Sequence, residues 1–447
     1  MIRIAIGVAV LAAFAACAGG RGAASPPGDA VALEGVTVID GTGAPPRPGM
    51  TVLVRRGRIA GIFAAGSQRL PAGTRVVPLA GHYVIPGLID SHVHLATSDR
   101  GGIYPSLLRH TLMGGVTTVR DMGGRTEKVA ELARAARTDT ALSPRIYYSA
   151  VVAGPRWFAT YDSVRVRYWS AGHVAGSAPG VRMLSADAEI DGIVREARRI
   201  GATGIKVYSD VPPARFAALA RAARAQGLRV WTHAVVPPTS PGELVAGGAQ
   251  VMSHSDQVIW AGAPAVGDRD ARRVLLRTVS PQGPAFAALF RAMRQRGVML
   301  EPTLYVMQGR GDGVPARASL DTLPGWAVDA AAAAHRAGVR LLAGTDDMGR
   351  QSPNIHGELQ LLVRQVGLTP LEAIRSATQY GAEALGAQDS LGTIAPGKVA
   401  DLVVLRADPS TDIRNTQTIA YVMQRGRLHA RTEPWHRMPL SDPPAAP

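Results

Sequence analysis

The chain has 447 residues, of which 46% are hydrophobic and 19% are charged, and its formal net charge at pH 7 is +15. This composition excludes long disordered tracts, and the length suffices for one large domain with a smaller accessory domain. The basic residues are nearly all arginine and recur at helical spacing, as in 131–137 and 215–221, without a compact basic run interleaved with aromatic residues. We therefore interpret them as solvated helix faces and predict no nucleic-acid partner.

The first residues have the form of an export signal. Arg3 precedes an apolar stretch at 4–16, which is too short to span a bilayer and is typical of a signal-peptide core. The run FAAC that ends at Cys17 resembles a bacterial lipobox, so we predict a signal peptide at 1–17, lipidation of Cys17 and a linker at 18–31. The protein would then be exported, as a periplasmic protein or an outer-membrane lipoprotein with a lipid anchor on Cys17. Simple signal-peptide cleavage and a retained apolar tail are the alternatives.

The two ends of the chain share a β-rich pattern. Short apolar strands separated by Gly and Pro occupy 32–83 and again 388–432, which predicts a small β-sandwich domain built from both chain ends, followed by a tail at 433–447. From 84 to 387, apolar β-type runs alternate with helices rich in Ala, Arg and Leu. This alternation predicts an α/β fold of the (β/α)8 TIM-barrel type. Such barrels collect catalytic side chains at the C-terminal ends of their strands, so polar residues that end apolar runs are the candidates to examine.

Two histidines close the first such run, in the segment GLIDSHVH. His92 and His94 are separated by one residue, and on an extended strand their side chains point to the same face. Two imidazoles on one face at a strand end form a natural metal site. The segment therefore predicts metal binding.

A lysine lies inside the apolar run GIKVY. Lys206 is one of three lysines among 49 basic residues, the others being Lys128 and Lys398. Arginine stays charged, whereas a buried lysine can lose its proton and react. An amine retained at this position therefore indicates chemistry that needs a deprotonable nitrogen. The alternative is a lysine at a strand edge whose amine reaches solvent.

Three further polar residues end apolar runs: His233 in RVWTH, His254 in QVMSH and Asp346 in VRLLAGTD. Taken singly, each histidine is equally well explained as a hydrogen-bonded core residue, but together they follow Lys206 at consecutive strand ends. A carboxylate at the last strand end can bind a metal and take a proton from water, which makes Asp346 the candidate catalytic residue. Because Cys17 is the only cysteine, no thiolate is available downstream.

The order His-x-His, Lys, His, His, Asp resembles the amidohydrolase superfamily, and within it the imidazolonepropionase-related and prolidase-like metal-dependent hydrolases. The resemblance covers nearly the whole chain after the linker. Further matching segments are VIPGLID at 84–90, GVTTVRD at 115–121, EPTL at 301–304, TPLEAI at 369–374 and GTIAPGKVADL at 392–402.

The resemblance implies a dinuclear metal site. The ligands that it implies are His92, His94, Lys206, His233, His254 and Asp346. Lys206 would be carboxylated by CO2 and bridge two divalent metal ions, with zinc as the expected metal. Asp346 would take the proton of a metal-bridging hydroxide and pass it to the leaving amine. The implied activity is hydrolysis of amide or peptide C–N bonds in small-molecule substrates, with an Xaa-Pro or related dipeptidase as the specific expectation.

Other functions stay open at this point. The same hydroxide could hydrolyse cyclic amides, lactones or organophosphate esters, because the fold and the metal site do not select the substrate. Outside enzymes, the alternatives are an envelope binding lipoprotein that retains the barrel as a scaffold, and a basic surface that docks on anionic lipid heads. The oligomeric state is open, a homo-oligomer included.

Four residues are weaker candidates for substrate contacts. They are His173 in a Gly-rich loop, Tyr208 on the strand face of the reactive lysine, Arg120 at the end of the second apolar run, which could instead pair with Asp121, and His356 in the loop after the candidate catalytic aspartate. Each has a structural explanation as well. No functional role is expected for the remaining histidines, which are His110 and His335 near helix ends and His82, His429 and His436 in or beside the β domain.

Overall fold

The computed structural model describes residues 30–98, 101–138, 141–160, 163–307, 323–346 and 354–431. The predicted signal peptide, Cys17 and the predicted tail with His436 lie outside these ranges, so export and lipidation stay predictions. Within the described ranges, no helix combines the length and the apolar character needed to cross a membrane.

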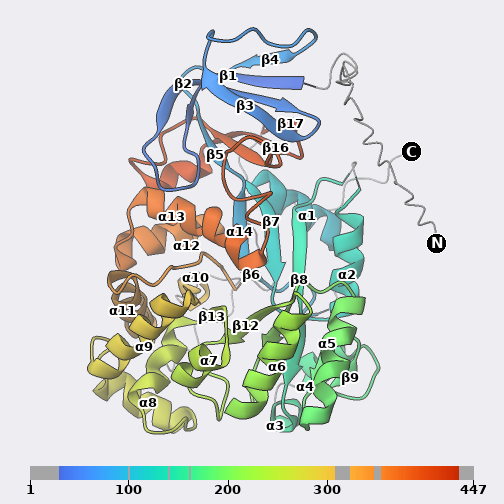
Figure 1. The fold of residues 1–447 in the computed structure, drawn as a ribbon, viewed down its shortest axis with the longest axis vertical. Helices are drawn as coiled ribbons and strands as arrows, with labels where there is room; N and C mark the ends of the chain where they lie inside the picture. Colours follow the sequence, from blue (N-terminus) through green and yellow to red (C-terminus); the bar gives the residue numbers. More distant parts are fainter. Residues whose placement is uncertain are drawn as a thin grey trace, which may run out of the picture.

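Strands from both ends of the chain form one mixed sheet (Figure 1). In the described residues it has eight strands, in the order β17-β16-β15-β5-β1-β2-β3, with β4 beside β1. The strands are β1 Ala30–Val38, β2 Arg47–Arg55, β3 Arg58–Ala64, β4 Arg75–Pro78, β5 Tyr83–Pro86, β15 Leu402–Leu405, β16 Ile419–Gln424 and β17 Arg427–Ala430. Val84 of β5 pairs with Val38 of β1 on one side and with Val404 of β15 on the other. The two ends therefore share one sheet, and its arrangement as a two-layer sandwich stays a prediction.

The middle of the chain forms a second sheet, of parallel strands in the order β6-β7-β8-β11-β12-β13-β14, with β10 and β9 attached beside β8. The strands are β6 Leu88–Val93, β7 Val116–Asp121, β8 Arg145–Ala153, β9 Ser177–Ala178, β10 Val181–Met183, β11 Gly204–Val207, β12 Arg229–His233, β13 Val251–Ser253 and β14 Met299–Glu301. All seven main strands run in the same direction, so their C-terminal ends meet at one edge.

The gap between β14 and β6 is closed by the segment 340–346. Leu300 forms a parallel bridge with Leu341, and Ser91 N donates to Ala343 O at 3.1 Å on the other side. The buried carboxylate of Asp90 accepts from the backbone N–H and the hydroxyl of Thr345, at 3.1 and 2.7 Å. The segment thus occupies the eighth strand position, and the parallel strands form a ring of the TIM-barrel type.

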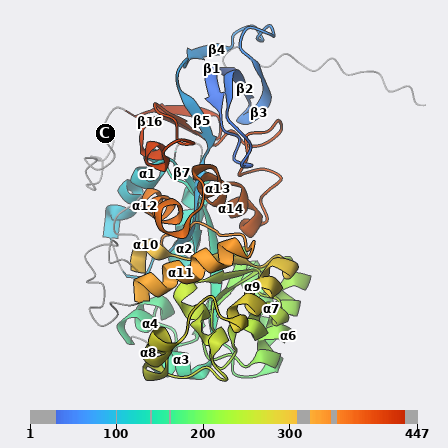
Figure 2. The same cartoon turned by 90° about the vertical axis from the view of Figure 1, so that its left-hand side faces the viewer.

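Helices connect the strands and cover the outside of the ring (Figures 1 and 2). The helices are α1 Tyr104–Met113, α2 Thr126–Ala135, α3 Pro155–Thr160, α4 Ser163–Ser170, α5 Ile190–Arg199, α6 Pro213–Ala225, α7 Pro241–Gly247, α8 Arg269–Thr278, α9 Pro284–Arg296, α10 Leu304–Met307, α11 Leu323–Arg336, α12 Ile355–Leu361, α13 Pro370–Ser376 and α14 Gln379–Leu385. Short 3-10 segments are η1 Gly101–Ile103, η2 Asp187–Glu189, η3 Ser255–Gly262 and η5 Ile413–Gln417, and η4 Leu362–Val366 is a π-helical turn.

Local sequence explains these helices. In α5 the residues at i, i+3, i+4 and i+7 from Ile190 are buried against the barrel, as an amphipathic helix requires. Helix α13 begins with a capping box, in which Thr369 accepts from the Glu372 N–H while the Glu372 carboxylate accepts from Thr369 N. Figure 2 shows the strands from both chain ends gathered beyond α13 and α14, away from the lower part of the barrel.

Candidate active site

Six side chains from five strand positions face one another at the C-terminal edge of the barrel. His92 belongs to β6, with His94 directly after it, and Lys206 belongs to β11. His233 ends β12, His254 follows β13, and Asp346 follows the segment at the eighth strand position. Parallel strands bring residues that are far apart in the chain to the same edge, so each polar residue that ends an apolar run arrives at this edge.

The carboxylate of Asp346 lies at the centre of the histidines. Its Oδ1 is 3.0 Å from His94 Nε2 and 3.4 Å from His92 Nε2, and its Oδ2 is 4.0 Å from His254 Nδ1. The ligand atoms of His92, His94 and Asp346 all lie within 4.8 Å of one another, a grouping that could hold a metal ion. Ring centroids are 5.2 Å apart for His94 and His92, 5.1 Å for His92 and His254, and 5.0 Å for His254 and His233. The four imidazoles therefore form a continuous row.

The Lys206 amine lies near the end of this row that His254 and His233 form. The side chain is fully buried, and Nζ donates to Thr232 O at 3.1 Å and to Ser253 Oγ at 2.9 Å. These two acceptors belong to the residues that immediately precede His233 and His254. Burial lowers the pKa of Lys206 to about 7. A large fraction of the amine is therefore unprotonated near neutral pH.

Each of the four histidines uses Nδ1 for a bond to the protein. The partners are Glu301 Oε2 at 2.7 Å for His92, Gly123 O at 2.6 Å for His94, Tyr208 O at 2.9 Å for His233 and Thr303 Oγ1 at 2.9 Å for His254. A ring fixed through Nδ1 presents Nε2 as its ligand atom, which is the usual arrangement of metal-binding histidines. The residues present therefore fit a metal site.

The protonation states of His233, His254 and Asp346 also suit metal ligands. Burial, followed by the charge of Lys206, holds the pKa of His233 well below the ordinary value. Burial also holds the pKa of His254 well below that value, although the charge of Asp346 acts in the opposite direction. Burial opposes ionisation of Asp346, but the surrounding histidines outweigh it and hold the pKa of that carboxyl far below its usual range. Neutral imidazoles and an ionised carboxylate are the forms that bind divalent metals.

Three non-glycine residues of the site have left-handed backbone conformations. The φ angles are 75° at His254, 55° at Thr303 and 56° at Asp346. This conformation is costly for residues with a Cβ and persists where the surrounding structure imposes it, often at functional sites. His254 N donates to Glu301 O at 2.8 Å, and Asp346 N donates to His92 O at 2.9 Å, so backbone bonds from neighbouring strands hold these conformations.

The sequence analysis assigned no role to Glu301. In the structure this residue binds His92 and other buried residues around the site. Its fully buried carboxylate accepts from His92 Nδ1, from Ser253 Oγ at 2.8 Å and from Arg120 Nη2 at 2.8 Å. Ser253 is also the acceptor of the Lys206 amine, so Glu301 is connected to both halves of the site. The available signal was that Glu301 ends the apolar run of β14, as the ligands end theirs.

Two candidates for substrate contacts, Arg120 and His356, are buried and bonded to other parts of the protein. Arg120 is fully buried, donates to Ser91 O and Glu301, and lies over the Trp231 ring at 4.7 Å, so its ion pair is with Glu301 rather than with the expected alternative, Asp121. Both ring nitrogens of His356 have partners in the protein, Thr416 Oγ1 and the carbonyl oxygen of Gly114, each at 2.9 Å. In the structure Arg120 thus holds Glu301 and His356 joins α12 to η5 and to the end of α1, and a substrate contact by either residue stays a prediction.

The other two candidates differ in their relation to the site. Tyr208 lies against it, with its ring 4.7 Å from that of His233 and its hydroxyl donating to Met122 O at 2.9 Å. His173 is exposed in the turn after α4. Neither placement tests a substrate contact. Among the remaining histidines, His110 and His335 lie in the last turns of α1 and α11, His82 precedes β5 and His429 lies in β17.

Comparison with known proteins identifies the class. Residues 83–428 match the amidohydrolase family, so the chain belongs to this family and is a metal-dependent hydrolase of carbon–nitrogen bonds. Ochratoxinase of Aspergillus niger is 24% identical over 403 residues, which cover 77% of this chain and 75% of that protein. Imidazolonepropionase of Ralstonia nicotianae is 26% identical over 405 residues, covering 81% of this chain and 87% of that protein. The family resemblance predicted from the sequence is confirmed.

The fold has a close counterpart among solved structures. A crystal structure of a Xaa-Pro dipeptidase with bound methionine aligns with a TM-score of 0.71 at 20% identity, over 90% of this chain and 100% of that chain. At this identity the likeness shows the fold alone, and it supports the TIM-like barrel.

Proposed function

We propose that this protein is a dinuclear amidohydrolase that cleaves amide or peptide C–N bonds of small substrates, with Xaa-Pro or related dipeptides as the best candidates. The observation that supports a dinuclear site is the position of Lys206. Its amine is fully buried, beside the residues that precede His233 and His254, whereas Asp346 lies against His92 and His94, at the other end of the row of imidazoles. A reactive amine in that place is suited to carboxylation by CO2, which arginine could not undergo.

The chain's own residues divide the work. The metal-holding residues would be His92, His94 and Asp346 for one ion, His233 and His254 for the other, and carboxylated Lys206 for both. Zinc bound there would polarise the scissile carbonyl and activate water. Asp346 Oδ1, which faces His92 and His94, is placed to accept the proton of the attacking water and return it to the leaving amine. Glu301 and the Tyr208 carbonyl keep the rings of His92 and His233 in the orientation that this requires.

The dipeptidase assignment rests on relatives rather than on a substrate contact. A Xaa-Pro dipeptidase shares the fold, and an imidazolonepropionase and an ochratoxinase are related in sequence. Fold does not select a substrate, so turnover must decide. We also propose export and a lipid anchor on Cys17, because the run FAAC follows an apolar core of signal-peptide length.

Metal analysis with and without bicarbonate tests the dinuclear site. Wild-type protein is expected to bind two equivalents of zinc when bicarbonate is present. Lys206→Met keeps the volume of the side chain but lacks the amine, so it is expected to retain at most one equivalent. After incubation with 13C-labelled bicarbonate, NMR should show a carbamate carbon in the wild type that is missing in Lys206→Met. Two tightly bound zinc ions in Lys206→Met would contradict the bridging role.

A substrate screen tests the specificity separately. Zinc-loaded protein is assayed on Xaa-Pro dipeptides, N-acyl amino acids, cyclic imides and esters. We expect hydrolysis of the first class. Turnover confined to cyclic imides or esters would reject the dipeptidase assignment while leaving the metal site intact.

A further inference from the structure

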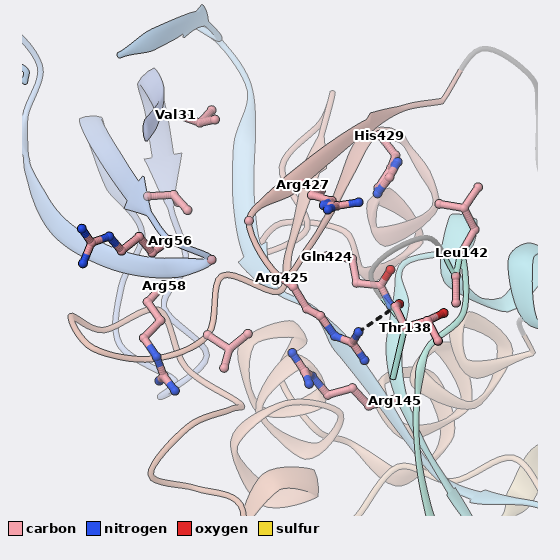
Figure 3. A pocket seen from close by; sticks show the side chains of 15 residues that line it. Val31, Arg56, Arg58, Thr138, Leu142, Arg145, Gln424, Arg425, Arg427 and His429 are labelled. Carbon is pink, nitrogen blue, oxygen red and sulfur yellow. Dashed lines mark hydrogen bonds between the residues drawn. The ribbon is translucent and has the colours of Figure 1, made fainter. Parts of the chain in front are cut away.

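A second pocket lies where the sheet of both chain ends meets the barrel (Figure 3). Its volume is about 690 Å³. Arg145, the first residue of β8, contributes to its wall, so the pocket is at the N-terminal end of that strand. The candidate metal ligands lie at the opposite, C-terminal ends of the strands. The pocket is therefore separate from the active site.

Positive charge dominates this pocket. Five arginines line it: Arg56, Arg58, Arg145, Arg425 and Arg427. No Asp or Glu is among the described residues that line it. Asp401, just behind the wall, accepts from Arg145 Nε at 2.9 Å and offsets one charge. His429 also lines the pocket, and burial together with Arg427 lowers its pKa. A wall with this excess of guanidinium groups attracts an anion of more than one charge.

Two of the arginines occupy positions that backbone preference does not explain. Arg56-Gly57 and Arg425-Gly426 are the central pairs of two-residue hairpins, with φ angles of 48° and 73° in the first pair and 49° and 80° in the second. Such turns strongly favour Asn-Gly or Asp-Gly, because both central residues need positive φ. The turns also touch, since a Cβ on Gly57 would lie 2.8 Å from Arg425 O. Arginine at both positions concentrates charge at their junction.

Two of the arginines, Arg425 of the β16–β17 turn and Arg145 of β8, are held in place by bonds to the protein. Arg425 donates to Arg137 O at 3.0 Å and to Ala136 O at 2.8 Å, at the end of α2. Arg145 is fixed by its pair with Asp401. In Figure 3 the side chains of Arg145 and Arg425 both lie in the lower part of the view, and Arg427 lies above them, next to His429. Bonds of this kind orient a guanidinium group before a ligand arrives.

We propose that this pocket binds a phosphate ester. Arginine has a planar fork of donors that matches phosphate oxygens, and several arginines around one pocket suit a group with two negative charges or a neighbouring pair of anions. Val31, Leu142 and Val399 provide an apolar part of the lining, where the organic portion of an ester would lie. A soluble phosphate ester and the glycerophosphate headgroup of an anionic lipid share this chemistry.

Binding of glycerol 3-phosphate to the zinc-loaded full chain tests the proposal by calorimetry. Arg427→Gln removes an exposed guanidinium from the pocket and is expected to weaken binding about tenfold, the effect of losing one charge-assisted contact. Arg58→Gln is the second variant, for the case that the first one misfolds. The matched control is Arg221→Gln, which removes the same charge from the exposed face of α6 and should leave the affinity within twofold.

A parallel arm uses vesicles of phosphatidylcholine with and without phosphatidylglycerol, measured by cosedimentation in low and high salt. Both variants keep the same N-terminal region, so any membrane attachment through Cys17 is equal in the two. A difference in vesicle binding between Arg427→Gln and Arg221→Gln therefore reports on the pocket. If Arg427→Gln weakens binding of glycerol 3-phosphate but not of the vesicles, the ligand is a soluble phosphate ester. If it weakens binding of the vesicles but not of glycerol 3-phosphate, the ligand is the lipid headgroup. Equal binding by both variants in both arms, or no binding in either, overturns the proposal.

Discussion

The four histidines at the barrel mouth each give one ring nitrogen to the protein, and the partner of that nitrogen decides how the ring is held. For His92 the partner is the buried carboxylate of Glu301, which is in turn held by Arg120 and Ser253. A carboxylate in this position fixes the tautomer and raises the basicity of the imidazole. Glu301 ends an apolar run just as the candidate ligands do, and no local feature separates a residue that binds a metal from one that holds a ligand.

Another buried carboxyl, Glu358 of α12, determines how stability depends on pH. It accepts from Leu304 N at 3.2 Å and Tyr305 N at 2.7 Å, and burial raises its pKa to about 8 from an ordinary value of 4.5. Between these pH values the folded state binds the proton that the unfolded chain has lost. The free energy of unfolding should therefore fall as pH rises from about 4.5 to about 8.

Glu358→Gln removes this titration. Relative to the wild type, the variant should gain stability as pH rises through this window, by up to roughly 1.4 kcal/mol per pH unit, the value for one proton. Urea unfolding at several pH values measures the difference. Glu372→Gln is the control, because the pKa of that capping-box carboxyl is lowered by its bonds with Thr369 despite some burial, so the difference should be flat above pH 5. A flat difference for Glu358→Gln would refute the buried titration.

At the scale of elements, the segment 340–346 matters most because it completes the barrel and carries Asp346. The sequence predicted a strand there, and the structure has a single bridge, between Leu300 and Leu341, followed by backbone and side-chain bonds to β6. Gly344 allows the close approach. A Cβ at this position would lie 2.7 Å from Glu301 Oε1 and 2.8 Å from the Cβ of His92.

We expect Gly344→Ala to lower both stability and metal affinity. The added methyl must displace Glu301 or His92, and such overpacking typically costs roughly 1–3 kcal/mol. Chemical unfolding and zinc titration measure the two effects. The matched control is Gly192→Ala in α5, where a Cβ meets nothing within 4 Å, and this change should stabilise the chain by about 0.5–1 kcal/mol. Unchanged zinc affinity in Gly344→Ala would contradict the packing argument.

For the molecule as a whole, the decisive contact is the one between the barrel and the sheet of both chain ends. The carboxylate of Asp401, 4% exposed, accepts from Arg145 Nε of the barrel at 2.9 Å and from Arg425 N of the β16–β17 turn at 2.6 Å. One carboxylate thus ties β8 to both the sheet and the turn beside the arginine pocket. Because the Asp401 carboxylate is buried and accepts two hydrogen bonds, its removal should cost more stability than the loss of a surface ion pair.

Asp401→Asn should therefore weaken the contact between the barrel and the sheet of both chain ends. We expect a loss of roughly 1–3 kcal/mol in the free energy of unfolding, reduced from the value for a fully buried pair because Arg145 is partly exposed. Equilibrium urea unfolding measures it. The same substitution at the partly exposed Asp412, which pairs with the exposed Arg414, should leave the unfolding midpoint unchanged. Equal effects at both positions would show that Asp401 acts as an ordinary surface charge.

The alternation of apolar strands and helices, and the polar residues that end the strands, could be predicted from the sequence because hydrophobic periodicity is a local property of the chain. These patterns predicted the barrel, and the family resemblance implied that His92, Lys206 and Asp346 belong to one site. The hydrogen-bond partners of buried side chains could not be predicted from the sequence. His92 and Glu301 are 209 positions apart, and His356 and Gly114 are 242 apart, so those contacts exist only once the barrel has closed. The arginine pocket arises in the same way, because two turns from opposite ends of the chain must first come into contact.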